Sequence, residues 1–139
     1  MGNLPAGAVG ECCAGNERLV SLAGMGLTRS QILDGLALVA VAVAWGEAQE
    51  GVLFCYTGTG ASMTANKVPG IRAALCSDAQ TAQGARWWND ANILVLSLRA
   101  TSPDVVKEIL DAWFSEAVRP DEIETINHLT EIEARHTSK

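Results

Sequence analysis

The chain has 139 residues, of which 48% are hydrophobic and 19% charged, and its formal net charge is −6. This length corresponds to one domain with a sizeable core, and the composition excludes a mostly disordered chain. Lysines and arginines are scattered singly and form no basic stripe that could neutralise a phosphate backbone, so we expect no nucleic-acid partner.

No membrane or export segment is predicted. The longest apolar run, Leu36 to Trp45, has about half the length that a bilayer-spanning helix needs. The first basic residue is Arg18, so no positively charged segment precedes an apolar stretch as in a secretory signal. The adjacent pair Cys12-Cys13 suits neither a C-x-x-C motif nor an ordinary disulfide, and we interpret it and Cys55 and Cys76 as reduced thiols. These features predict a cytoplasmic protein.

The N-terminal part of the sequence has little pattern. Residues 1–27 are rich in glycine and contain no convincing strand or capped helix. Residues 30–45 predict a helix with Ser30 as its N-cap, although the alternation of valine and alanine leaves a strand as the minority interpretation. We therefore divide the chain into an atypical segment, residues 1–28, and a domain of residues 29–139 that ends in a C-terminal helix.

From residue 51 onward, short β-rich runs alternate with longer amphipathic ones, which is typical of an α/β protein with a parallel sheet. Strands are predicted over 51–55, 71–75 and 92–97. Helices are predicted over 61–66 and 79–87, after the capping sequence Thr101-Ser102-Pro103-Asp104, and over 121–135. The last of these helices carries an apolar stripe that suggests packing on another subunit, made of Ile123, Ile126, Leu129 and Ile132.

One short segment suggests chemistry by itself. A strand that delivers Cys55 into the turn Thr57-Gly58-Thr59-Gly60 at a helix start places a thiol beside several backbone N–H groups. Such a position lowers the pKa of a thiol, so Cys55 could exchange a carbon-bound proton while the N–H groups stabilise an enediolate oxygen. The alternative, from these residues alone, is a packing cysteine before a common glycine turn.

A longer stretch resembles a known family. Residues 51–76, GVLFCYTGTGASMTANKVPGIRAALC, followed by Trp88-Asn89-Asp90-Ala91-Asn92, are similar to the sugar-phosphate isomerases of the ribose 5-phosphate isomerase B and galactose 6-phosphate isomerase group. The resemblance implies a Rossmann-like three-layer αβα sandwich and aldose–ketose exchange through an enediolate. It also implies no metal or other cofactor, and a homodimer or homotetramer with its sites at the subunit interface.

The family's roles can be carried over by position. The resemblance implies that Cys55 is the proton-shuttling catalytic residue and that Thr57, in the oxyanion loop, is a second catalytic residue. It implies a set of substrate-binding residues, Gly58, Thr59, Gly60, Ala61, Asn89 and Arg119. Solvation or helix capping is the favoured interpretation of three nearby polar residues, Asn66, Lys67 and Arg72.

The chain departs from the family's pattern in three places. Nothing in residues 1–28 reproduces the family's first strand and its sugar-binding Asp-His pair, so the N-terminal β-α-β portion is expected to be incomplete or altered. Trp88 stands where the family usually has a histidine that assists ring opening, and an indole only donates a hydrogen bond. Arg119 is the one arginine left of the family's phosphate-binding tail. The pair Trp87-Trp88 is interpreted as core or interface, with a sugar-stacking platform as the alternative.

Two functions are consistent with the sequence. The first is a cofactor-free aldose–ketose isomerase of the ribose 5-phosphate isomerase B type, acting on a sugar phosphate or a related sugar. The second is a catalytically impaired or redirected relative that binds a small polyol through the same loop. His128 and His136 have no cysteine or histidine at ligand spacing, so we predict no metal site.

Overall fold

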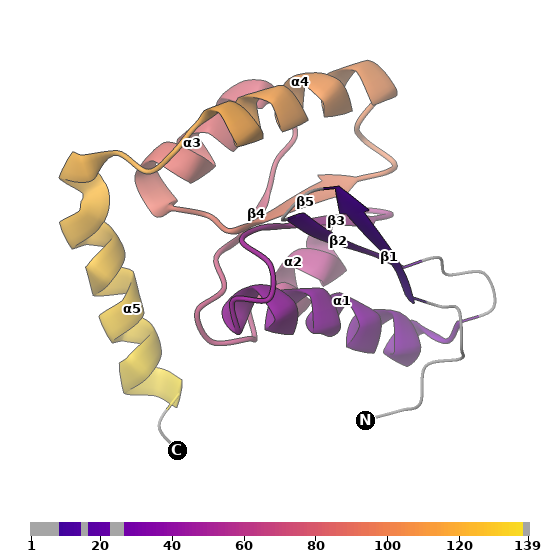
Figure 1. Ribbon diagram of the computed structural model, residues 1–139, viewed down its shortest axis with the longest axis horizontal. Helices are drawn as coiled ribbons and strands as arrows, with labels where there is room; N and C mark the ends of the chain where they lie inside the picture. The colour runs from indigo at the N-terminus through magenta and orange to yellow at the C-terminus, as the bar shows by residue number, and fades with distance from the viewer. Residues whose placement is uncertain (1–8, 15–16, 23–26, 138–139) are drawn as a thin grey trace.

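The computed structural model describes the backbone of residues 9–14 and 17–22, and the backbone and side chains of residues 27–137 (Figure 1). In chain order the elements are β1 (Val9–Ala14), β2 (Glu17–Leu22), α1 (Arg29–Ala44), β3 (Gly51–Cys55), α2 (Thr59–Ala65), β4 (Ala73–Leu75), α3 (Ala79–Asn89), β5 (Ile93–Ser97), α4 (Pro103–Ser115), the 3₁₀ turn η1 (Pro120–Glu122) and α5 (Ile123–Thr137). No helix among these residues is long and apolar enough to cross a membrane.

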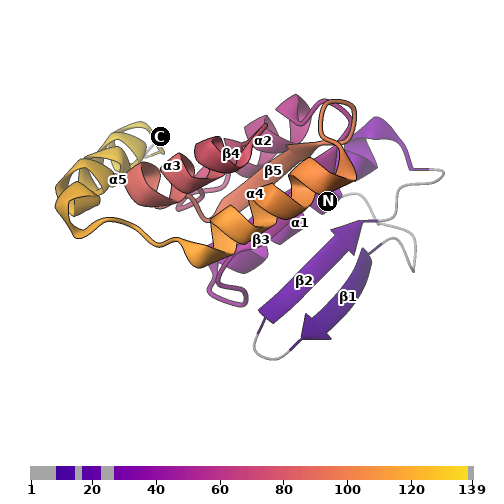
Figure 2. The ribbon, with the colours of Figure 1, turned by 90° about the horizontal axis from the view of Figure 1, so that it is seen from above.

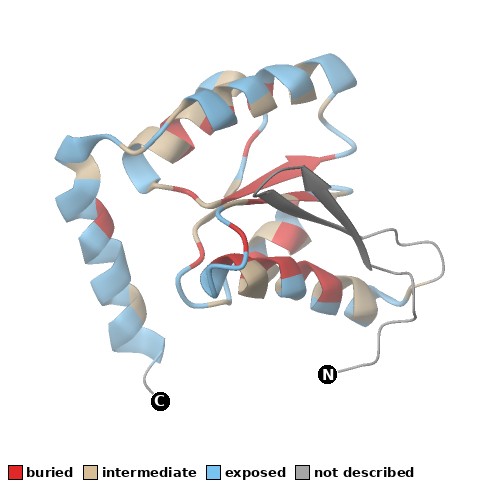
Figure 3. Cartoon of the chain, in the orientation of Figure 1, coloured by how far each residue is buried: buried red, intermediate tan, exposed pale blue. Residues whose placement is uncertain are grey.

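The centre of the fold is a parallel sheet in the order β3-β5-β4. Gly51 lies opposite Ile93 and Cys55 opposite Ser97, so β3 and β5 end at the same edge. Every residue of β5 is buried, because this central strand has a neighbour on each side and helices on both faces (Figure 3). The expected α/β class with a parallel sheet is confirmed.

Two helical layers enclose this sheet. Helices α1 and α2 cover one face, and α3 and α4 cover the other (Figures 1 and 2). Leu53 and Val95 belong to the first core, with apolar residues of α1 and α2. Leu94 and Leu96 belong to the second, where they pack with Trp113 of α4. The sandwich fixes the carboxyl ends of β3 and β5 side by side, which places Cys55 and Ser97 at the same edge of the sheet.

The expectation that residues 1–27 contain no strand is wrong. β1 and β2 pair antiparallel from Val9 opposite Leu22 to Ala14 opposite Glu17, and they form a separate two-stranded sheet. The available sequence signal for this hairpin was the pair Gly15-Asn16, a dipeptide typical of two-residue hairpin connections. The runs before and after this pair lack the alternation of apolar and polar residues that would predict strands. In the described part of the chain, this hairpin precedes α1, at the place where the family's first β-α-β portion was expected to be incomplete or altered.

Helix boundaries follow from their caps. Thr28, not Ser30, is the N-cap of α1, because its hydroxyl accepts from the Gln31 N–H while the Gln31 side chain accepts from the Thr28 N–H. The predicted cap of α4 is confirmed: the Ser102 hydroxyl accepts from the Val105 N–H. Asp78 caps α3 in the same way.

Three other predicted elements differ at their ends. The helix expected over 61–66 begins at Thr59, because Gly58 turns the chain immediately before it. The strand expected over 71–75 begins only at Ala73, and the helix expected over 79–87 continues to Asn89. The C-terminal prediction covers η1 and α5 together.

Helix α5 stands apart from the sandwich at the amino ends of the strands (Figure 1). It is held by the buried Ile126 and by Glu133, whose two carboxylate oxygens accept from the Gly70 N–H at 3.1 and 2.9 Å. The rest of the predicted apolar stripe is exposed within one chain: Ile123 by 50%, Leu129 by 42% and Ile132 by 39%.

Candidate active site

Cys55 is the last residue of β3 and lies at the carboxyl edge of the sheet. The chain turns directly after it, because Gly58 adopts a left-handed conformation with φ 82° and α2 begins at Thr59. Thr57 and Thr59 face each other across this turn, with their hydroxyl oxygens 2.9 Å apart. The structure therefore brings together the thiol and the glycine turn that the sequence places there.

The Cys55 thiol is surrounded by backbone donors. Partial burial raises its pKa, but hydrogen bonds from the N–H groups of Ala61, Gly58, Thr57 and Tyr56 outweigh burial, and the pKa is lowered from its ordinary value. The opposite holds for Cys76, where burial and the charge of Asp78 raise the pKa to about 11. Of the two, Cys55 is the thiol suited to accept and return a proton near neutral pH.

Gly58 cannot be replaced without cost. A Cβ at this position would overlap Leu75 Cδ1, and the backbone has a positive φ. We expect Gly58→Ala to lower the free energy of unfolding by about 1–2 kcal/mol, chiefly from backbone strain, because the exposed Leu75 side chain can move aside. Denaturant unfolding followed by circular dichroism measures this loss.

Gly60 provides the matched control. A Cβ there meets nothing within 4 Å, and its φ is not positive. Because Gly60 lies inside α2, Gly60→Ala should leave stability unchanged or raise it by about 0.5–1 kcal/mol. Equal losses of stability in the two variants would contradict this explanation of Gly58.

The loop after β5 completes this edge of the sheet. The backbone N–H of Leu98 donates to the Cys55 carbonyl at 2.9 Å, and that of Arg99 donates to the Tyr56 carbonyl at 3.0 Å. Arg99 is exposed, and its guanidinium has no ion-pair partner among the described residues. Sequence reasoning missed this cation; the available signal was an arginine two residues after the end of a strand parallel to β3.

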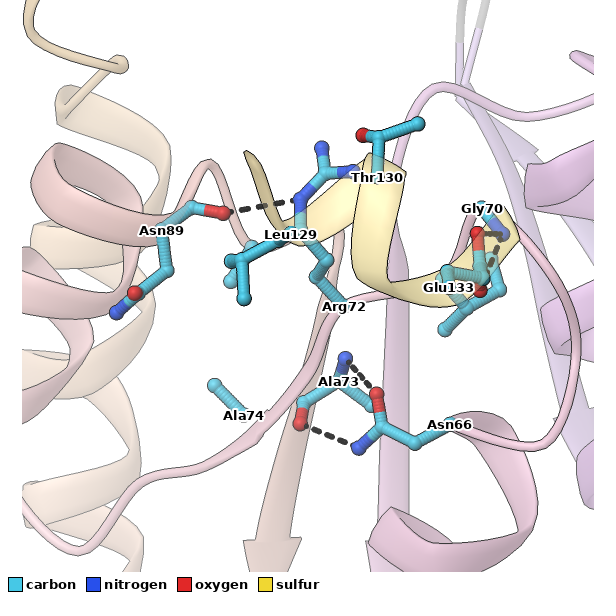
Figure 4. Close-up of a pocket in the computed structure, with 11 residues that line it drawn as sticks. Asn66, Gly70, Arg72, Ala73, Ala74, Asn89, Leu129, Thr130 and Glu133 are labelled. Atoms are coloured by element: carbon cyan, nitrogen blue, oxygen red, sulfur yellow. Dashed lines mark hydrogen bonds between the residues drawn. The ribbon is translucent and has the colours of Figure 1, made fainter. Parts of the chain in front are cut away.

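A pocket of about 360 Å³ lies at the opposite, amino end of the sheet, between α5 and the sandwich (Figure 4). Asn89, the last residue of α3, lines it together with Leu129 and Thr130 of α5. Asn89 is therefore not beside Cys55 in one chain. Four residue steps along β3 separate the two ends of the strand by about 13 Å.

Polar residues around this pocket hold the backbone. The Asn66 side chain donates to the Ala73 carbonyl at 2.9 Å and accepts from the Ala73 N–H at 2.8 Å. Arg72 donates to the Asn89 carbonyl at 2.9 Å (Figure 4). It also donates to the Asp90 carbonyl at 2.9 Å, and its guanidinium pairs with the Asp90 carboxylate at 2.8 Å. Arg72 thereby fixes the end of α3 and the position of Asn89.

Arg119 also lies near the amino end. Its guanidinium stacks over the Trp87 ring at 4.0 Å, and its N–H donates to the Trp87 carbonyl. The Trp87 indole donates to the Glu116 carboxylate, so this ring serves packing between α3 and the turn that follows α4. Trp88 is 50% exposed and packs against Gly84, where an added Cβ would lie 2.7 Å from its ring.

The predicted site residues thus fall into two groups within one chain. Cys55 and the Thr57–Ala61 turn lie together at the carboxyl edge, whereas Asn89 and Arg119 lie at the other end of the sheet. Within residues 27–137, no cluster of three or more His, Cys, Asp or Glu side chains could hold a metal ion.

Comparison with known proteins gives the family. Residues 23–133 match the family model described as Ribose/Galactose Isomerase. The chain belongs to this family. It is 48% identical over 75 residues to ribose-5-phosphate isomerase B of Escherichia coli, and 47% identical over 75 residues to D-erythrulose-4-phosphate isomerase of Pectobacterium atrosepticum. Each alignment covers 54% of this chain.

A solved structure extends the likeness. The ribose-5-phosphate isomerase B of Clostridium thermocellum has a TM-score of 0.73 and 39% sequence identity, over 76% of this chain and 72% of that one. The chain spans about half the length of the curated relatives, 50% of the Escherichia coli protein and 49% of the Pectobacterium protein. The resemblance found in the sequence and the Rossmann-like α/β fold that it implied are confirmed.

Proposed function

We propose that this protein is an aldose–ketose isomerase that acts on a sugar phosphate through an enediolate. The observation that carries the proposal is the Cys55 thiol at the carboxyl edge of β3, with four backbone N–H groups directed at it. The named relatives that act on ribose 5-phosphate and erythrulose 4-phosphate support it, as does membership of the family. Nothing in the comparisons favours the polyol-binding alternative.

The chemistry needs one group that both takes and returns a proton. The Cys55 thiolate removes the proton from C2 of the open-chain aldose, and the C–H electrons form the C1–C2 double bond as the carbonyl oxygen becomes an enediolate oxygen. The C2 hydroxyl proton passes to the C1 oxygen, and the thiol returns its proton to C1, so that C1 becomes CH2OH and C2 becomes the ketone carbon. Backbone N–H groups of the Thr57–Ala61 turn, and the Thr57 hydroxyl, stabilise the negative oxygen.

A second copy of the chain completes the site in this proposal. Asn89 and Arg119 lie near the amino end of the sheet, whereas Cys55 lies at its carboxyl edge, and β3 between these edges is about 13 Å long. The exposed part of the α5 stripe, Ile123, Leu129 and Ile132, gives a homodimer or homotetramer an apolar surface to bury. Asn89 of one subunit would then contact the sugar held at Cys55 of the next.

Arg99 supplies the charge that a sugar phosphate requires. It follows β5 on the loop bonded to the Tyr56 carbonyl, so its backbone is fixed beside the Cys55 turn. We assign it, together with Arg119, to the phosphate group, because a guanidinium can bind phosphate oxygens through two parallel hydrogen bonds.

The described free thiols, Cys55 and Cys76, are consistent with a reducing, cytoplasmic location.

Trp88 predicts slow turnover of unmodified ribose 5-phosphate. This ring cannot act as a general acid or base in ring opening, and such assistance is worth about 10²–10⁴-fold in rate. We expect the turnover number of the unaltered chain on ribose 5-phosphate to lie below the ordinary range of about 1–10³ per second. The Trp88→His substitution should raise this turnover number. Steady-state assays of both chains measure this, and ordinary turnover by the unaltered chain would contradict it.

The proposed function is tested by isomerisation of a panel of pentose and hexose phosphates and of the same sugars without phosphate. Conversion of at least one sugar phosphate, and slower conversion of its unphosphorylated form, is expected. A chain that converts none of them, although it is folded by circular dichroism and sugars are presented at millimolar concentration, would refute the proposal.

A further inference from the structure

A buried hydroxyl lies behind the Cys55 turn and has no part in the proposed chemistry. Ser97, the last residue of β5, is 8% exposed. Its hydroxyl donates to the Tyr56 carbonyl at 3.0 Å and accepts from the Ala100 N–H at 3.2 Å. Both hydrogen-bonding functions of this buried hydroxyl are therefore used, one of them on the backbone that follows the candidate acid–base residue.

The geometry of the peptide group links that hydrogen bond to the thiol. The Tyr56 carbonyl and the Thr57 N–H belong to one planar trans peptide, in which they point in opposite directions. The carbonyl oxygen is held by the Ser97 hydroxyl and the Arg99 N–H, so the Thr57 N–H points away from β5. This N–H is one of the backbone donors that lower the pKa of the Cys55 thiol. Donors on the carbonyl also polarise the peptide and strengthen its N–H as a donor.

We infer that Ser97 is a positioning residue whose hydroxyl fixes the Tyr56–Thr57 peptide so that the Thr57 N–H is aimed at the Cys55 sulfur. Ser97 does not contact the reacting atoms and acts only through this peptide. The inference rests on the proposed function for the role of Cys55, but the geometry it concerns is that of the thiol alone.

The test compares variants of equal shape. Ser97→Thr keeps the hydroxyl and Ser97→Val replaces it with a methyl group, so the pair differs at one atom; Ser97→Ala removes the hydroxyl without added bulk. The Thr101→Val control removes a different buried hydroxyl of the same loop, one that has no hydrogen-bond partner in the described structure. For each chain, the rate of Cys55 alkylation by iodoacetamide is followed from pH 5 to pH 10 by peptide mass spectrometry.

We expect Ser97→Val and Ser97→Ala to move the midpoint of Cys55 alkylation upward by about 0.5–1 pH unit, because the thiolate loses a well-aimed donor. Ser97→Thr and Thr101→Val should keep the midpoint of the unaltered chain. An equal upward shift of the Cys55 alkylation midpoint in Thr101→Val would indicate a general loosening of the loop and would count against the inference. Equal midpoints in Ser97→Thr and Ser97→Val would overturn the inference.

A measurement on the unaltered chain covers the case in which the variants do not fold. The NMR chemical shift of the Thr57 amide should change with pH at the same midpoint as Cys55 alkylation. A Thr57 amide shift that does not change over this pH range would overturn the inference. Neither readout requires turnover. A hydroxyl-dependent midpoint in a chain that isomerises no sugar would therefore refute the proposed function and leave the positioning role standing.

Discussion

A Cys55→Ala chain is expected to isomerise sugar phosphates about 10²–10⁴-fold more slowly than the unaltered chain. Alanine removes the group that takes the proton from C2 and returns it to C1, while the backbone donors of the turn remain. Cys55 is only half-buried, so the change leaves a small cavity and the chain should still fold. Steady-state isomerisation and circular dichroism together measure the two expectations.

Cys76→Ala is the matched control. Cys76 is 1% exposed in the core under α3, and burial keeps its thiol protonated. Its removal should lower the free energy of unfolding but leave the isomerisation rate per folded molecule unchanged.

In the unaltered chain the isomerisation rate should rise with pH through the lowered pKa of Cys55, because the thiolate is the reacting base. If Cys55→Ala keeps more than a tenth of the activity, Cys55 is not the acid–base residue.

Two inactive variants should restore each other's activity when they are combined. If Asn89 serves the Cys55 site of a partner subunit, Cys55→Ala and Asn89→Ala each destroy every site in a pure sample. In randomly mixed oligomers, a site has an intact Cys55 in half of the cases and an intact Asn89 from its neighbour in half of those. Co-expression should therefore recover about a quarter of the unaltered activity.

Differently tagged copies make this experiment decisive. Two-step affinity purification isolates the mixed oligomers, and light scattering gives their mass. Mixed oligomers no more active than either pure variant would show that Asn89 does not complete a partner's site. A monomeric mass at micromolar concentration would contradict the shared site as well.

The Cys55 edge could be predicted because its determinants are local. An apolar run ending at Cys55 and followed by Thr57-Gly58-Thr59-Gly60 specifies a buried strand and a tight turn whatever the rest of the chain does. The structure adds what spacing cannot give, namely that Leu75 packs where a side chain at Gly58 would lie and that the loop after β5 holds the Tyr56 carbonyl. These contacts join residues 17 and 41 positions apart in the sequence, respectively.

The other candidate residues depended on information that one sequence does not contain. Asn89 and Arg119 were assigned by resemblance, and a resemblance does not say which subunit supplies a residue. The N-terminal hairpin was missed because neither Val9–Ala14 nor Glu17–Leu22 has the strict alternation of apolar and polar residues that predicts a half-buried strand. Thr28 was overlooked as a cap because Ser30 stands next to the same helix start, although Thr28 and Gln31 have the spacing of a capping box.

Exchange of solvent deuterium into the substrate tests most directly the claim that Cys55 moves a proton between neighbouring carbons. With the sugar phosphate converted best in the panel, incubation in deuterated water followed by proton NMR should show deuterium at the carbon that receives the proton. The Cys55→Ala chain should show none above the uncatalysed level. Equal deuterium incorporation by Cys55→Ala and by the unaltered chain would contradict the account, because the proton would then move without the Cys55 thiol.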